Sequence, residues 1–102
     1  MLEKSFGLLF FLKQTKSQND DLIFIYLKIT VDGKSIELST KRKCEQARWN
    51  SQTGRAIGTK EAKKELNLYL DTMAQMVYHA KRTLLDSNKL FSAQDIKDLR
   101  PG

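Results

Sequence analysis

The first half of the chain alternates between apolar and polar positions with the two-residue period of a β-strand. The clearest run is Leu22 to Val31, in which every second residue is aliphatic: Ile23, Ile25, Leu27, Ile29 and Val31. Successive side chains of a strand point to opposite sides of a sheet, so these five define a core side. The other side carries Leu22, Phe24, Tyr26, Lys28 and Thr30.

Two further strands are expected beside this one. Phe6 to Lys13 is rich in the aromatic and aliphatic residues that suit a pleated sheet, and the polar stretch Gln14 to Asp21 is expected to be a loop. Asp32-Gly33 suits a type I′ turn, whose two central residues need positive φ, so Lys34 to Lys41 returns as the third strand. Its core side receives Ile36 and Leu38, and its outer side receives Ser35, Glu37, Ser39 and Lys41.

The segment from Arg42 to Gly58 is expected to be an irregular connector, with one helical turn at Glu45 to Trp49 and a loop from Asn50. Trp49 is interpreted as an anchor packed at the sheet edge, because a large ring is usually well buried. A helix is predicted over Lys60 to Ser87, with Thr59 as N-cap and Asn88 just past its end. Its apolar stripe comprises Ala62, Leu66, Tyr69, Leu70, Met73, Met76, Val77, Ala80 and Leu84.

These elements predict an α+β fold, a three-stranded antiparallel sheet packed on one long C-terminal helix in the order β-β-β-α. The chain of 102 residues is long enough for one domain. After the long helix, Ser92 and Asp95 have the spacing of a capping box, which predicts a short helix that ends at Arg100-Pro101-Gly102.

Charge narrows the range of partners. The net charge is +6 and the isoelectric point about 9.6, which favours a polyanion, either nucleic acid or an anionic membrane surface. No apolar run approaches the roughly 20 residues of a membrane-spanning helix. The apolar stretch Phe6 to Leu12 lacks a small-residue cleavage site after it, so it is interpreted as a strand rather than a signal peptide. A cytoplasmic location without membrane contact is expected.

The sequence offers no catalytic or metal site. The single cysteine, Cys44, cannot form an internal disulfide, and together with the single histidine, His79, it is too few ligands for a structural zinc site. Gly54 and Gly58 lack the lysine and hydroxyl ending of a phosphate-binding loop. We therefore expect no enzyme activity, no cofactor and no small-molecule substrate.

The basic residues suggest a DNA-binding surface on the outer side of the sheet. The major groove admits a narrow β structure, in which hydroxyls and rings meet base edges and surrounding cations neutralise phosphates. The candidates for contact with duplex DNA are Lys13, Lys16, Tyr26, Lys28, Thr30, Lys34, Ser39, Lys41, Arg42 and Lys43. Glu37 opposes this function unless it accepts from a cytosine amine or pairs with a neighbouring lysine. The alternative is an ordinary solvated sheet face, since lysines also protect sheet edges.

Several of these segments together resemble a known family. The chain resembles the opening of tyrosine recombinases from mobile elements in four segments. They are Phe10-Phe11-Leu12-Lys13, the run from Ile25 to Lys34, Ser39-Thr40-Lys41, and Arg48-Trp49-Asn50. The chain is similar, over about Phe6 to Leu85, to the N-terminal arm-type DNA-binding domain of a phage or conjugative-transposon integrase. Cys44 departs from the family, where an apolar or aromatic residue is more usual, and is expected to be a small buried hydrophobe.

The resemblance implies a function in DNA integration and recombination. In the family the sheet inserts into the major groove of arm sites that flank the recombination core, and the catalytic residues belong to a C-terminal domain. No segment here matches that domain, and Tyr26, Tyr69 and Tyr78 lack the context of its nucleophile. The resemblance implies an arm-type domain over 1–90 and the start of a helical core-binding domain, truncated, over 91–102. Other recombinase protomers on the same DNA are expected as partners.

Two other functions stay open from the sequence. One is a protein–protein interaction module that uses the same sheet face or the exposed side of the long helix. The other is a double-stranded RNA-binding fold, which also sets three strands against a helix but has another helix before its first strand. The residues 1–5 are too few for that helix.

Overall fold

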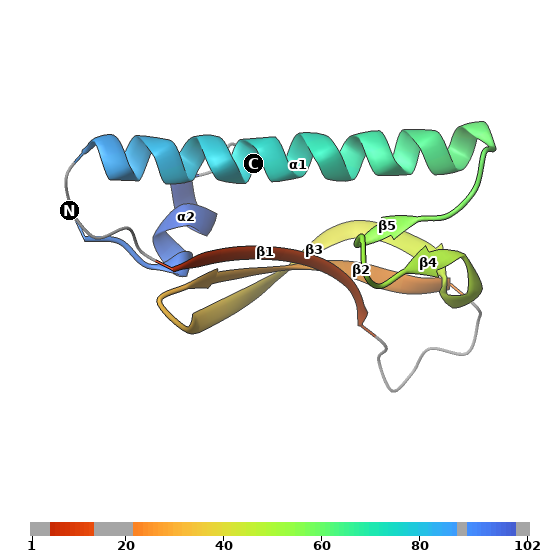
Figure 1. Ribbon diagram of the computed structural model, residues 1–102, viewed down its shortest axis with the longest axis horizontal. Coiled ribbons are helices and arrows are strands. Elements are labelled where there is room, and N and C mark those ends of the chain that lie inside the picture. Colours follow the sequence, from red (N-terminus) through yellow and green to blue (C-terminus); the bar gives the residue numbers. More distant parts are fainter. Residues whose placement is uncertain (1–4, 14–21, 88–89, 100–102) are drawn as a thin grey trace.

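The computed structural model describes residues 5–13, 22–87 and 90–99 of the chain. Its elements are β1 (Phe6–Lys13), β2 (Leu22–Val31), β3 (Lys34–Glu45), a 3₁₀ turn (Gln46–Arg48), β4 (Trp49–Asn50), β5 (Arg55–Ala56), α1 (Glu61–Asp86) and α2 (Ala93–Leu99). Figure 1 shows two layers, with α1 running along one side of the sheet and the smaller elements filling the two ends between them. The predicted α+β order is confirmed.

The sheet has the order β1-β2-β3 and is antiparallel throughout. Leu27 in the central strand lies opposite Phe10 on one side and Leu38 on the other, which lines up the apolar positions of all three strands. The β2–β3 turn is the one expected, because Asp32 has φ 53° and Gly33 has φ 81°. The loop expected at 14–21 lies outside the described residues.

The third strand continues four residues beyond the predicted Lys41, to Glu45. It does so by means of a bulge, because the pairing passes from Tyr26–Ser39 to Phe24–Lys43, with three residues of β3 facing one of β2. Lys41 sits in this bulge with φ 65°, a left-handed conformation. The expected irregular connector at 42–45 is therefore wrong, since these residues are strand.

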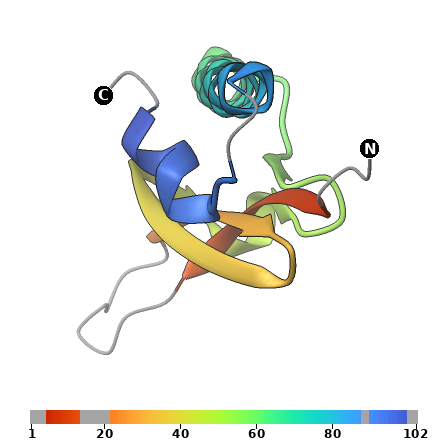
Figure 2. The ribbon, with the colours of Figure 1, turned by 90° about the vertical axis from the view of Figure 1, so that its left-hand side faces the viewer.

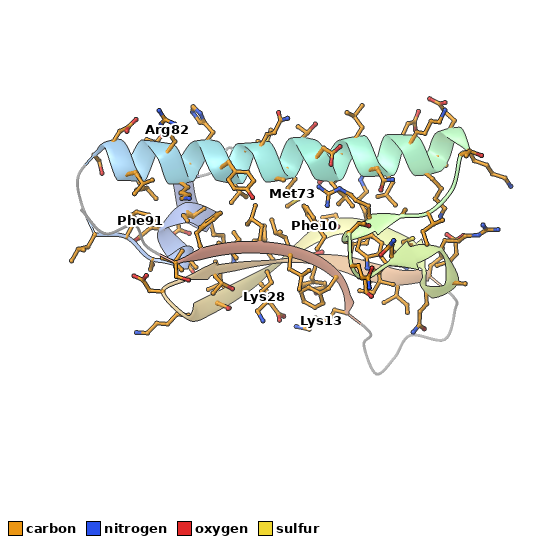
Figure 3. The ribbon with its side chains drawn as sticks, viewed as in Figure 1. Phe10, Lys13, Lys28, Met73, Arg82 and Phe91 are labelled. Carbon is orange, nitrogen blue, oxygen red and sulfur yellow. The ribbon has the colours of Figure 1, made fainter. Side chains whose placement is uncertain are left out.

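The core lies between the aliphatic side of the sheet and α1. Ile25, Leu27 and Ile29 have no exposed surface, as the alternation predicted. From α1 the stripe contributes Leu70, Met73, Val77 and Ala80. Figure 3 shows Phe10 and Met73 pointing toward one another between the two layers.

The long helix is shorter at both ends than predicted. It begins at Glu61 with Lys60 as N-cap, so the expectation that Thr59 caps it is wrong, and it ends at Asp86. Ala62 and Met76, at the margins of the predicted stripe, are exposed, and Asn88 lies outside the described residues. In the ranges 61–86 and 93–99, neither helix is both long and apolar enough to cross a bilayer.

A small hairpin occupies the region predicted to be a loop. β4 and β5 pair through Trp49–Ala56 and Asn50–Arg55, and Gly54 takes φ 67° in the turn between them. Trp49 is half-buried and packs against the core, as expected of an anchor. The hairpin lies under the first half of α1 in Figure 1.

The second helix fills the other end of the layer between α1 and the sheet. Its capping box is present, because Ser92 N–H donates to Asp95 Oδ2 at 2.8 Å and Asp95 N–H donates to Ser92 Oγ at 3.3 Å. Phe91, Ala93 and Ile96 are buried in the same cluster as the sheet and α1. Figure 2, which looks along α1, shows α2 tucked between the long helix and the twisted sheet.

Candidate nucleic-acid interface

The side of the sheet turned away from α1, called here the outer face, is uncovered by any described element (Figure 1). The strand register places on it the alternate residues Leu9, Phe11, Lys13, Phe24, Tyr26, Lys28, Thr30, Ser35, Glu37, Ser39 and Lys43. Figure 3 shows Lys13 and Lys28 both pointing away from α1 on this face. The expected separation into a dry side and a mixed polar side is confirmed by the complete burial of Ile25 and Leu27.

Rings form the floor of the outer face and cations lie above them. The Phe11 and Tyr26 rings have their centroids 6.3 Å apart at a tilt of 41°. Lys13 Nζ lies 4.9 Å from the centroid of Tyr26, and Lys43 Nζ lies 4.6 Å from that of Phe24. Such cation–π contacts hold flexible lysine side chains over the sheet while the ammonium groups stay accessible to an anion.

One carboxylate lies among these cations. Glu37 is directly opposite Lys28 in the β2–β3 register, but its Oε1 accepts from Lys13 Nζ at 2.7 Å, across the central strand. The hydrogen bond and charge of Glu37 raise the pKa of Lys13, so the lysine is cationic at neutral pH. The pairing of Glu37 with a neighbouring lysine, one of the two alternatives for this residue, is the arrangement present in the free chain.

Hydroxyl groups line the part of the outer face nearest the β2–β3 turn and the bulge. Thr30 Oγ1 and Ser35 Oγ are 2.7 Å apart and share a hydrogen bond. Ser39 Oγ accepts from the Lys41 backbone N–H at 3.0 Å, which helps to hold the left-handed bulge. Each hydroxyl keeps further hydrogen-bonding capacity, since an O–H group both donates and accepts.

Three lysines on or beside the outer face are unpaired within the described part of the chain. Lys28, Lys34 and Lys41 form no ion pair with any described carboxylate. Lys28 is central on the outer face and Lys41 is exposed at the bulge. Lys34 follows the turn and lies opposite the buried Val31, so the register directs it to the side of the sheet that faces α1. The outer face therefore presents positive charge at Lys28, and beside it at Lys41, that no described carboxylate offsets.

Two of the residues predicted for the interface, Lys34 and Arg42, lie on the side of the sheet that faces α1. Lys34 is opposite the buried Val31 and in line with Ile36 and Leu38. Lys16 lies outside the described residues. Arg42 lies toward α1, with its guanidinium carbon 4.3 Å from the centroid of the Tyr69 ring. The bulge explains this position, because the alternation resumes beyond it with Lys43 outward and Cys44 inward, so Arg42 also turns inward.

The sequence did not assign β1 residues to the outer face beyond Lys13. Leu9, which is 45% exposed, and Phe11 both lie on it beside Lys28 and Tyr26. The alternation in β1 gives no signal, because its inward residues Phe10 and Leu12 are as apolar as its outward ones. Only the register with β2 distinguishes the two sides of this strand.

The cysteine and the histidine lie away from this surface. Cys44 is completely buried, and its burial raises the pKa of the thiol above its ordinary value of 9.0. This confirms it as a small buried hydrophobe. His79 is exposed on α1, on the other layer of the molecule.

Comparison with known proteins supports a nucleic-acid ligand. A family model described as an arm DNA-binding domain matches residues 10–97, which includes the second half of β1, all of β2 and β3, the β4–β5 hairpin, α1 and most of α2. Neither the curated proteins nor the solved structures give a match.

Proposed function

We propose, on the premise that this chain belongs to the arm DNA-binding domain family, that it binds duplex DNA through its outer face. The family is a non-catalytic DNA-binding module typical of integrase-type recombinases. The chain would act as the N-terminal module of a site-specific tyrosine recombinase, holding arm-type sites during DNA integration and recombination. The assignment of residues 91–102 to the start of a following core-binding domain stays a prediction.

The observation that carries the proposal is the contrast between the two sides of the sheet. On one side Ile25 and Leu27 are buried under α1, and on the other Lys28 lies among rings and hydroxyls without an ion pair to any described carboxylate. A major groove about 12 Å wide accepts a narrow β surface of this kind. The surface offers donors for bases and cations for the phosphates on either side of the groove.

We assign the central residues to bases and the peripheral ones to phosphates. The central set is Tyr26, Lys28, Thr30 and Ser39, and the peripheral set is Lys13, Lys16, Lys41 and Lys43. Lys34 would reach a phosphate from beside the β2–β3 turn, since the register directs it away from the outer face. Arg42, stacked on Tyr69, would reach a phosphate only from the outer edge of β3. Tyr26 and Phe11 add apolar surface that suits a thymine methyl group.

The test measures binding to duplex DNA as a function of salt, with a charge-matched control. With about five phosphate contacts, log K should fall with log salt with a slope near −4.5. Lys28→Gln should weaken binding by about 1–3 kcal/mol. Arg82→Gln removes the same charge from the side of α1 turned away from the sheet (Figure 3) and should leave affinity nearly unchanged.

An amide-shift titration locates the contact directly. DNA should move the amide resonances of β2 and β3 at Lys28, Ser39 and Lys43, and leave those on the exposed side of α1 in place. Equal loss of affinity in the two variants, or shifts confined to α1, would contradict the use of the outer face. Binding of a protein partner that is insensitive to salt and to Lys28→Gln would favour the interaction module instead.

A further inference from the structure

The ion pair between Lys13 and Glu37 combines an acceptor and a donor at one point of the outer face. The two residues come from the outer strands β1 and β3, and their side chains meet across β2 at 2.7 Å, with Lys13 Nζ over the Tyr26 ring. Both side chains remain accessible, with exposed fractions of 47% and 39%. A ligand on the outer face would therefore meet both groups together.

Two described carboxylates, Glu37 and Glu45, occupy outward positions of the three strands. Glu45 forms an ion pair with Lys63 on α1, so among the described residues of the strands only the Glu37 carboxylate remains on the outer face. An ionised carboxylate only accepts hydrogen bonds, so against the phosphate backbone it is repulsive. In contact with a duplex it needs a donor from a base edge. Its partner Lys13 offsets its charge, so the pair as a whole does not repel the DNA.

Among the major-groove edges, that of cytosine suits Glu37 best. Cytosine offers the N4 amino donor without a neighbouring acceptor on its own ring, whereas adenine places the N7 acceptor beside its N6 donor. The second carboxylate oxygen would face that N7 and be repelled. The guanine paired with cytosine presents O6 and N7, both acceptors, which suit an ammonium group such as that of Lys13.

We propose that Lys13 and Glu37 together read one C·G base pair, with Glu37 accepting from the cytosine amino group and Lys13 donating to guanine O6 or N7. This inference rests on the proposed function, since it requires the duplex to lie on the outer face. An exposed ion pair contributes little to stability, so the two side chains can turn from each other toward the bases at small cost.

The experiment selects bound sequences from a library of duplexes with a randomised central segment, using the full chain. For the wild type, the selected sites should share a fixed C·G pair, and replacing it with A·T should weaken binding by about 5- to 150-fold. Glu37→Gln should shift the preference at that position to A·T, because glutamine pairs with adenine N6 and N7. Lys13→Gln should weaken the preference for the same base pair.

Glu65→Gln is the matched control, because it removes the same charge from an exposed position on α1. It should leave the selected sequences unchanged, and circular dichroism should show the same fold for every variant. If Glu37→Gln selects the same sites as the wild type, or binds all duplexes more tightly by one uniform factor, the base-pair reading is overturned while DNA binding by the outer face stands. If the wild type binds no duplex at all, the proposed function itself fails.

Discussion

A single hydroxyl group completes the hydrogen bonding at the bulge of β3. Ile25 has no opposing residue in the β2–β3 register, and its carbonyl accepts instead from Thr40 Oγ1 at 2.8 Å. Thr40 Oγ1 in turn accepts from the Arg42 backbone N–H at 3.2 Å. Thr40 is completely buried, so no water can replace its hydrogen bond to the Ile25 carbonyl. The position of Lys41 and Lys43 on the outer face therefore depends on one buried threonine.

Thr40→Val tests this dependence, because valine keeps the shape of threonine and lacks its hydroxyl. The Ile25 carbonyl would be left buried without this donor and the Arg42 N–H would lose its acceptor, which should lower the free energy of unfolding by about 1–3 kcal/mol. Urea denaturation measures the change. Thr30→Val is the control, since that hydroxyl pairs with Ser35 at an exposed site and its loss should cost about 0.5 kcal/mol or less. Equal effects from the two substitutions would contradict the structural role of Thr40.

Among the elements, those with strong periodicity could be predicted from the sequence. The aliphatic alternation of β2, the Asp32-Gly33 turn and the stripe of α1 each depend on neighbouring residues only, and each was found within a few positions of its predicted bounds. The outer face follows directly from β2, which explains why Tyr26, Lys28 and Thr30 could be placed from the sequence.

The elements that could not be predicted are set by tertiary contacts. The bulge at Lys41 has no local signal, because a lysine in the left-handed region is uncommon and only Thr40 and the surrounding pairing hold it there. The β4–β5 hairpin has two residues in each strand, too few for a period, and is held by α1. Consequently the sequence pattern could not predict that Arg42 points inward and that Phe11 points outward.

The β4–β5 hairpin should detach from α1 when one side chain is removed. Asn67 Oδ1 accepts from the Ala56 N–H at 2.8 Å and Asn67 Nδ2 donates to the Ala56 carbonyl at 3.0 Å, as a neighbouring strand would. Asn67→Ala should speed hydrogen exchange at Ala56 and lower overall stability by about 1–3 kcal/mol. Lys64→Ala, on the exposed side of the same helix, is the control. Unchanged exchange at Ala56 would show that Arg55 and Asp71 hold the hairpin without Asn67.

At the scale of the whole molecule, one side of the sheet forms the core and the other side is available for binding. α1, α2 and the hairpin all lie on one side of the sheet, so the core is built entirely on that side (Figures 1 and 2). The other side is free of described elements and carries cations that nothing in the core requires. Substitutions there should change binding while leaving folding nearly intact, whereas those on the core side should do the reverse.

The layers are also joined by an ion pair, which makes the stability of the molecule depend on pH. Lys63, near the start of α1, donates to Glu45 Oε1 at the end of β3 at 2.6 Å. This hydrogen bond lowers the pKa of Glu45 below its ordinary value of 4.5. Because the pKa of Glu45 is lower in the folded state, the unfolded chain binds more protons in acid. The contribution of Glu45 to the free energy of unfolding is therefore complete above pH 4.5. It is lost as the pH falls through the lower pKa of the folded state.

Thermal denaturation of the wild type and Glu45→Gln across the acid range measures this contribution. At neutral pH the wild type should have the higher Tm, and the difference should shrink steadily below pH 4.5 as Glu45 is protonated. The raised pKa of Lys13 does not interfere, because the stabilisation that it contributes is constant below pH 10.5 and is lost only as the pH rises above that value. Lys63→Gln should reproduce the loss at neutral pH, since it removes the same hydrogen bond. A difference in Tm that stays constant down to the lowest pH would show that the charge of Glu45 does not contribute to stability.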